Sequence, residues 1–301
     1  MGEISYYDNL VELMDEHYPF FSALWKLSKK NFGKNWEKDF NTNVEVLLSA
    51  KKINTTEKKI VDGYSNFCSD ALMSQAYFEK HLKYELSSYN EVVEKCYSNE
   101  DYMNNRYLPG QFIAHFIWPH HYKLMENFQN EILYQIKDDI KLFYEVGVGC
   151  GMYSLKTLQN INDVVGIGYD ISDYSLNFTK NIIDENKFQS RYSVENYDLT
   201  KRPVEKKADL IISQEVLEHL ENPQEFIISL YKSVRNNGWG YITAAINAGH
   251  TDHIYLYKSP EEVEKQLLSA GWKILKRNIE YANDYTPLHI RPTIAAYLLQ
   301  K

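Results

Sequence analysis

The feature that most constrains the fold is a glycine-rich stretch from Tyr144 to Ser154, with the sequence YEVGVGCGMYS. It follows an apolar run, Leu142–Val146, which predicts a buried parallel strand, and it precedes Met152–Leu158, which can begin a helix. A strand, a glycine turn and a helix N-terminus together direct backbone N–H groups and the positive end of the helix dipole at a ligand. The stretch therefore predicts an α/β protein that binds a ligand at this turn.

The spacing of the glycines distinguishes two kinds of cofactor. A dinucleotide-binding loop has the pattern G-x-G-x-x-G. Counted from Gly147 and Gly149, the third glycine of that pattern would fall at Met152, so an NAD-dependent oxidoreductase is the less favoured alternative. The pattern present is E-x-G-x-G-x-G, from Glu145 to Gly151, which is similar to the first motif of class I S-adenosylmethionine (SAM) methyltransferases. Taken alone, the stretch is also compatible with a tight turn in another α/β protein.

The rest of the chain divides into a helical part and an α/β part. Residues 1–135 show no strand-like alternation, and Tyr6–Lys30 is predicted to be helical, with stop signals at Asn31 and Gly33. From Asp138 onward, strands alternate with helices, which is typical of a parallel sheet. The predicted strands are Lys141–Val146, Val164–Tyr169, Tyr192–Tyr197, Ala208–Ser213, Trp239–Ile246, Trp272–Tyr281 and Ile290–Leu299.

Acidic residues follow two of these strands at the edge where α/β sheets bind ligands. Asp170 ends the second strand, where a carboxylate can accept hydrogen bonds from both ribose hydroxyls of an adenosyl group. A helix cap is the alternative role, which Ser172 can also fill. Asp198 ends the third strand and could accept from the adenine amino group beside an apolar wall at Leu199; a simple turn aspartate is the alternative.

The segment Ser213–Pro223, SQEVLEHLENP, closely resembles the EVLEHLxxP segment of methyltransferases in the ubiquinone and menaquinone biosynthesis group. Together with the glycine motif, Asp170 and Asp198, it resembles a class I methyltransferase over about residues 140–300. The resemblance implies a Rossmann-like, seven-stranded, mostly parallel sheet whose last strand is antiparallel. It implies SAM as cofactor and S-adenosylhomocysteine as product. It also implies a set of cofactor-binding residues: Glu145, Gly147, Gly149, Gly151, Asp170, Ile171, Asp198, Leu199, Gln214 and Glu215.

The resemblance leaves the helical region, residues 1–135, without an assigned role. Its stretch Arg106–Tyr122 is dense in aromatic side chains and histidines, which suit a cationic sulfonium or amine. We expect this region to form a substrate-binding lid domain over the SAM-binding domain, residues 136–301, and it also offers a surface for a homodimer. The alternative is an aromatic interface between helices. The candidate substrate residues are Tyr107, His115, Trp118, His120 and His121.

Methyl transfer needs a general base only if the acceptor must lose a proton. Histidine titrates near neutral pH, and His250 and His253 lie on the loop after the fifth predicted strand, so they are the leading candidates. His219 ranks below them because its position in the EVLEHL segment is more often structural. His250, Asp252 and His253 could also bind a metal, but a third assured ligand is missing, and we expect none.

Composition limits the remaining possibilities. The net charge of −8 and pI near 5.6 disfavour a nucleic-acid partner, which requires a basic face. The sequence contains no apolar run of 18 residues, so we expect no membrane span. Its three cysteines include no C-x-x-C pair, which predicts free thiols in the cytoplasm. The sequence therefore predicts a SAM-dependent methyltransferase that modifies an O, N or C nucleophile of a small organic acceptor. A SAM-binding protein with other chemistry, or a scaffold, is the alternative.

Overall fold

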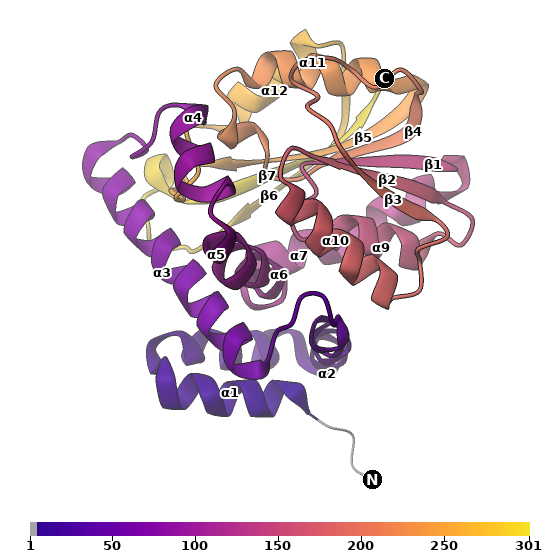
Figure 1. Ribbon diagram of the computed structural model, residues 1–301. Coiled ribbons are helices and arrows are strands. Elements are labelled where there is room, and N and C mark those ends of the chain that lie inside the picture. Colours follow the sequence, from indigo (N-terminus) through magenta and orange to yellow (C-terminus); the bar gives the residue numbers. More distant parts are fainter. Residues whose placement is uncertain (1–4) are drawn as a thin grey trace.

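A computed structural model describes residues 5–301 and contains a helical region followed by a seven-stranded sheet (Figure 1). The strand order is β3-β2-β1-β4-β5-β7-β6. Strands β1 to β5 pair in parallel, and β7 pairs antiparallel with both β5 and β6. This confirms the predicted Rossmann-like fold. The strands are β1 (Leu142–Val146), β2 (Val165–Asp170), β3 (Tyr192–Asn196), β4 (Ala208–Ser213), β5 (Val234–Ile246), β6 (Lys273–Tyr281) and β7 (Thr293–Gln300).

The glycine turn connects β1 to helix α9 (Met152–Asn160), as its sequence predicts. Gly147 and Gly151 have φ angles of +75° and +74°, a region that only glycine adopts readily. Space is also restricted, because a Cβ on Gly151 would lie 2.5 Å from Cγ2 of Thr179. The turn therefore requires glycine both for its backbone conformation and for its close packing against α10 (Asp173–Glu185).

The helical region begins with α1 (Tyr6–His17), α2 (Pro19–Ser49) and α3 (Glu57–His81). The predicted stop at Gly33 is a break within α2, where φ is +72°, and helical structure resumes directly after it. Thr56 caps α3 by accepting a hydrogen bond from the Lys59 N–H. Shorter elements follow: α4 (Tyr89–Val92), η1 (Val93–Tyr97), α5 (Glu100–Tyr102), η2 (Met103–Tyr107), α6 (Leu108–Ile117), α7 (Pro119–Asn127), η3 (Phe128–Leu133), α8 (Tyr134–Ile136) and η4 (Lys137–Asp139).

The helical region shares a hydrophobic core with one face of the sheet. The Phe128 ring lies 4.9 Å from that of Tyr153 and 4.6 Å from that of Tyr241, so η3, α9 and β5 meet in one cluster. An ion pair between the buried Lys156 of α9 and the partly exposed Asp39 of α2, at 2.9 Å, joins the two regions further. The other face is covered by α11 (Pro223–Ser233) and α12 (Pro260–Ser269) (Figure 1). The helical region is thus fixed against the sheet.

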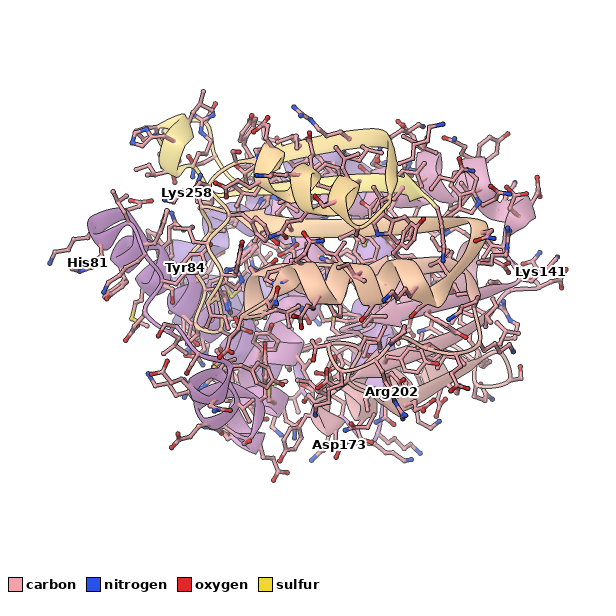
Figure 2. The ribbon with its side chains drawn as sticks, turned by 90° about the horizontal axis from the view of Figure 1, so that it is seen from above. His81, Tyr84, Lys141, Asp173, Arg202 and Lys258 are labelled. Carbon is pink, nitrogen blue, oxygen red and sulfur yellow. The ribbon has the colours of Figure 1, made fainter. Side chains whose placement is uncertain are left out.

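The two ends of the sheet have different surroundings. Figure 2 shows Lys141, directly before β1, at one end, and Tyr84 and Lys258 at the other, where the parallel strands finish. Residues between α3 and α6 therefore lie beside the ligand-binding edge of the sheet. Among the helices of residues 5–301, none is both long enough and apolar enough to span a membrane.

Candidate cofactor and catalytic site

A cavity of about 490 Å³ opens at the carboxyl ends of β1, β2 and β4. Most of the predicted cofactor residues line it: Gly147, Gly149, Asp170, Ile171, Asp198, Leu199, Gln214 and Glu215. Four residues of the helical region complete its wall: Tyr89, Tyr97, Tyr107 and Gln111. The cavity is therefore built jointly by the sheet edge and the helical region.

Asp170 connects the end of β2 to the glycine turn. Its Oδ1 accepts a hydrogen bond from the Ser172 N–H at 2.8 Å, and its Oδ2 accepts from the Gly149 N–H at 3.3 Å. Ser172 itself caps α10, by accepting from the Ser175 N–H, so the helix does not depend on Asp170 for its cap. Burial raises the pKa of Asp170 to about 6. The carboxylate thus both shapes the turn and faces the cavity.

Asp198 forms the turn after β3 and also lines the cavity. Its Oδ1 accepts from the Thr200 N–H at 2.9 Å, which forms the turn after β3. Its Oδ2 lies 3.2 Å from Nζ of Lys201. The residue also lines the cavity, together with the buried Leu199.

Glu145 and Gly151 are not among the residues that line the cavity. The Glu145 side chain is buried behind the glycine turn, where its Oε2 accepts from the Ser154 N–H at 2.7 Å. It thereby satisfies a free N–H at the start of α9. Burial raises the pKa of Glu145 to about 8. The structure therefore gives Glu145 a supporting position beneath the turn instead of one on the cavity wall.

Gln111 and Tyr89 are cavity residues that sequence reasoning did not single out. Gln111 lies on α6, and its Oε1 accepts from the Cys150 N–H of the glycine turn at 3.0 Å. The backbone N–H of Tyr89 donates to Oε1 of Glu221 at 2.9 Å, which joins α4 to the segment after β4. Gln111 falls within the aromatic stretch Arg106–Tyr122, but nothing in its local pattern indicates a contact with residue 150.

The loop after β5 and the turn after β4 together place three histidines around the buried carboxylate of Asp252. Oδ1 of Asp252 lies 2.7 Å from Nδ1 of His250, and its Oδ2 accepts from the Tyr97 hydroxyl at 3.2 Å. His219, from the 3₁₀ turn η5 (Leu217–His219), has its Nδ1 3.0 Å from the Asp252 carbonyl oxygen. Burial opposes ionisation of Asp252, but His219 and His250 together hold its pKa well below the usual range.

The three candidate catalytic histidines have different surroundings. His219 lines the cavity directly. The His250 ring lies 5.9 Å from the ring of Tyr107, a cavity residue, and 4.9 Å from that of Phe67. The Nδ1 of His253 is 2.7 Å from the Ala248 carbonyl oxygen, and burial lowers the pKa of this histidine well below its usual range. His250 is therefore both oriented by a carboxylate and adjacent to the cavity wall.

Of the candidate substrate residues, Tyr107 lines the cavity and the others form a cluster of rings behind it. Trp118 stacks on His120 at 5.9 Å between ring centres, and His115 and His121 lie 5.7 Å apart. Nδ1 of His121 is 3.7 Å from Oε1 of Glu215, and burial lowers the pKa of His121 to about 3. This cluster matches the alternative interpretation, an aromatic interface between helices.

Comparison with known proteins identifies part of the chain. Residues 144–239 match the family described as a methyltransferase domain. The solved structure titled "PigF with SAH" is similar over 81% of this chain and 73% of its own, with a TM-score of 0.56 and 12% identity. The N-methyltransferase NodS from Bradyrhizobium japonicum WM9, in complex with S-adenosylhomocysteine, covers 70% of this chain and 97% of its own, with a TM-score of 0.49 and 15% identity. A comparison with curated proteins gives no match.

The methyltransferase-domain match covers the glycine turn, Asp170, Asp198 and the segment from Gln214 to Glu221. It implies SAM as the cofactor of this domain. The residues present fit that cofactor, because the cavity combines glycine-turn N–H groups with a carboxylate at the end of β2. The closer resemblance to the ubiquinone and menaquinone group stays a prediction.

Proposed function

We propose that this protein is an enzyme that transfers a methyl group from SAM to a small organic acceptor. The observation that carries the proposal is the Asp170 carboxylate, which connects the glycine turn to the end of β2 within a methyltransferase domain. When bound, SAM supplies a methyl group on a sulfonium that a nucleophile can displace in line. The protein then has to align the reactants and exclude water.

The cavity residues have separate tasks in this proposal. The glycine turn and the start of α9 bind the carboxylate of the methionine part through N–H groups other than those of Gly149, Cys150 and Ser154, which already have acceptors in the protein. Asp170 accepts hydrogen bonds from the ribose hydroxyls, and Asp198 and Leu199 contact the adenine. Gln214 and Glu215 lie beside the sulfonium, where polar and acidic groups stabilise a cation that is removed from water.

We assign the role of general base to His250. Asp252 accepts a hydrogen bond from its Nδ1 and so fixes the ring, which leaves Nε2 to take a proton from an acceptor hydroxyl or amine. Within residues 5–301 that Nε2 is buried and has no hydrogen-bond partner. Tyr107 lines the cavity, and its ring contacts that of His250, so this proton acceptor lies directly behind the cavity wall.

The helical region determines which acceptor enters, because Tyr89, Tyr97, Tyr107 and Gln111 all come from it and line the cavity. The rings of the three tyrosines favour a flat or cationic acceptor. The same residues are absent from the part of the chain that matches the methyltransferase domain. Acceptor choice is therefore encoded outside the domain that binds the cofactor.

Two measurements test the proposal. Isothermal titration calorimetry with SAM and with NAD separates the cofactor interpretations; we expect SAM to bind and NAD not to bind. Incubation with SAM carrying an isotopically labelled methyl group, together with a fractionated pool of small metabolites, then follows transfer of the label. SAM binding without any transfer across such pools would favour a binding or scaffold protein, and NAD binding would overturn the assignment.

A further inference from the structure

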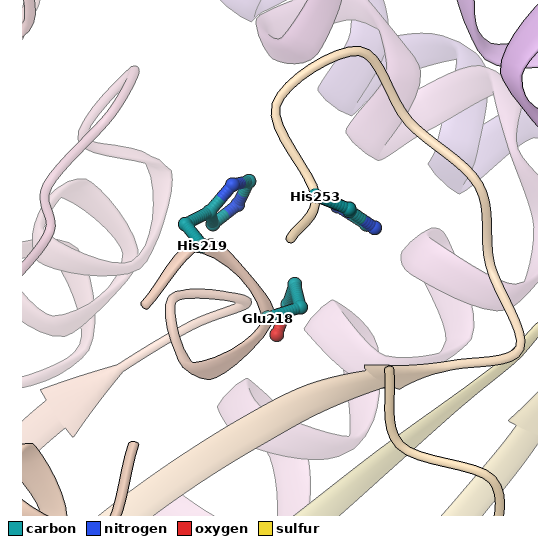
Figure 3. Close-up of side chains that lie close together, drawn as sticks. All are labelled: Glu218, His219 and His253. Carbon is teal, nitrogen blue, oxygen red and sulfur yellow. The ribbon is translucent and has the colours of Figure 1, made fainter. Parts of the chain in front are cut away.

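We propose that Glu218, His219 and His253 form a binding site for a divalent transition-metal ion of the zinc type. One potential ligand atom from each residue lies within 4.8 Å of those of the other two. Figure 3 shows the three side chains: Glu218 and His219 come from the turn after β4, and His253 comes from the loop after β5. The proposed site thus combines one histidine of the loop after β5 with two ligands from another segment.

The Glu218 carboxylate has no other evident role. The side chain is fully buried, and neither of its oxygens has a hydrogen-bond partner among the described residues. A buried carboxylate without a partner is costly, and such groups are rare in folded proteins. Asp252, in the same cluster, differs because His250 and Tyr97 already satisfy its two oxygens. Glu218 is therefore the carboxylate that remains available to a ligand.

Both histidine rings are held in the way that metal-binding histidines usually are. Nδ1 of His219 lies 3.0 Å from the carbonyl oxygen of Asp252, and Nδ1 of His253 lies 2.7 Å from that of Ala248. A carbonyl can only accept, so Nδ1 carries the proton in each ring and Nε2 keeps its lone pair. Metal-ligating histidines typically donate their second nitrogen to such a carbonyl or carboxylate, which fixes the ring for the ion.

The charge around the site also favours a cation. The carboxylates of Glu218 and Asp252 are fully buried, and the partly buried Glu215 belongs to the same group of acidic side chains. Throughout residues 5–301, the ion-pair partners of Glu215 and Asp252 are histidines only, and Glu218 has none. No lysine or arginine of the described chain forms an ion pair with this group. A divalent ion would supply the missing positive charge.

The ligand set indicates which ion would bind. Two imidazoles and one carboxylate form a common zinc site that keeps one coordination position open, whereas Mg²⁺ and Ca²⁺ prefer oxygen ligands alone. His219 also lines the cofactor cavity, so the ion would lie at the cavity wall. The site goes beyond the proposed methyl transfer and does not depend on it.

The test uses the full chain without a polyhistidine tag, which would itself bind zinc. After treatment with a chelator and its removal, the protein is titrated with Zn²⁺ and separately with Mg²⁺ by calorimetry. Mass spectrometry also measures the metal content of untreated protein. We expect one Zn²⁺ per chain and no binding of Mg²⁺. Glu218→Gln and His253→Ala should each weaken Zn²⁺ binding by at least about 100-fold, more than the loss of an outer-shell partner.

Two control variants make the result specific. His81→Ala removes an exposed histidine at the far end of α3 (Figure 2) and should leave Zn²⁺ affinity unchanged. His250→Ala removes the neighbouring loop histidine, which lies outside the proposed ligand set. This variant should also keep the Zn²⁺ affinity of the wild type. Circular dichroism and SAM titration of every variant show that each one folds. The proposal is overturned if the wild-type chain binds no Zn²⁺, or if Glu218→Gln binds it normally. A chain that binds SAM but not Zn²⁺ would contradict the metal site alone.

Discussion

Replacing Asp170 by asparagine tests the cofactor site most directly. The carboxylate accepts hydrogen bonds from the N–H groups of Ser172 and Gly149, and we propose that its remaining lone pairs accept from two ribose hydroxyls. Hydrogen bonds to a charged acceptor contribute about 1.5–3 kcal/mol each. Asparagine keeps one oxygen and loses the charge, so we expect SAM binding to weaken by about 2–4 kcal/mol, which corresponds to roughly 30- to 1,000-fold in Kd.

The same substitution should change the stability of the empty protein only slightly, because two effects oppose each other. Burial raises the pKa of Asp170 to about 6, above the unfolded value near 3.9. An acid whose pKa is raised by folding binds its proton more tightly in the folded state, so ionisation above that pKa opposes folding. A neutral amide removes this cost at pH 7. The amide also replaces one acceptor oxygen by an NH2 donor, so the N–H group of either Ser172 or Gly149 loses its acceptor, at a cost of about 1–3 kcal/mol. Because the two effects oppose each other, the melting temperature of the Asp170→Asn variant without SAM should lie close to that of the wild type.

Calorimetry with SAM and thermal unfolding without it measure the two effects on the same samples. Asp173→Asn, an exposed change at the start of α10, is the matched control and should alter neither quantity. A Kd within about threefold of wild type would refute the assignment of Asp170 to the ribose. A lower melting temperature together with lost affinity would mean that the residue acts only by holding the glycine turn.

Four further predictions follow from the site. SAM affinity of the wild type should fall about tenfold between pH 7 and pH 5 as Asp170, with its pKa of about 6, gains a proton. Calorimetry of Asp170→Asn should show a smaller pH dependence, because Glu215, whose pKa burial raises to about 7, still titrates. Gly147→Ala places a Cβ against Val216 at a φ of +75°, so SAM titration and thermal unfolding should show lost binding and a cost of about 1–3 kcal/mol. Gln111→Ala leaves a glycine-turn N–H without its acceptor and should weaken SAM binding by about 1–3 kcal/mol. An unchanged Kd would mean that this contact from the helical region does not support cofactor binding. His250→Ala should lower turnover about 100- to 10,000-fold with SAM affinity retained, and a near-normal rate would remove it as the base.

Local sequence patterns were sufficient to predict the sheet and to place most of the proposed cofactor residues at one edge of it. The glycine turn after Val146 requires backbone conformations that only glycine adopts, so its role is visible in the sequence. Asp170 and Asp198 lie where parallel strands end, and all such ends meet at one edge of the sheet. These predictions rest on contacts between residues close in sequence, or on a rule that applies to every sheet of this kind.

The N-terminal helices show where the sequence pattern was incomplete. Gly33 does interrupt α2, as its stop signal suggested, but helical structure continues to Ser49 because buried side chains such as Trp36 and Phe40 pack there. The Trp36 indole donates to the Phe116 carbonyl oxygen at 2.8 Å. Tertiary packing of an apolar face therefore decided the extent of this helix more than the local signal did.

Only the tertiary structure decided which distant residues meet. The sequence placed Glu145 in the cofactor motif, but its side chain turns behind the strand and binds the start of α9. Nothing near Gln111 predicts that it reaches the N–H of Cys150. Similarly, Glu218 and His253 lie on segments after different strands, and their approach depends on how two loops fold over one sheet edge. Periodicity and turn chemistry act over a few residues, whereas side-chain direction and loop packing depend on the whole core, and this is why the sequence determined the scaffold and the fold determined the chemistry at its edge.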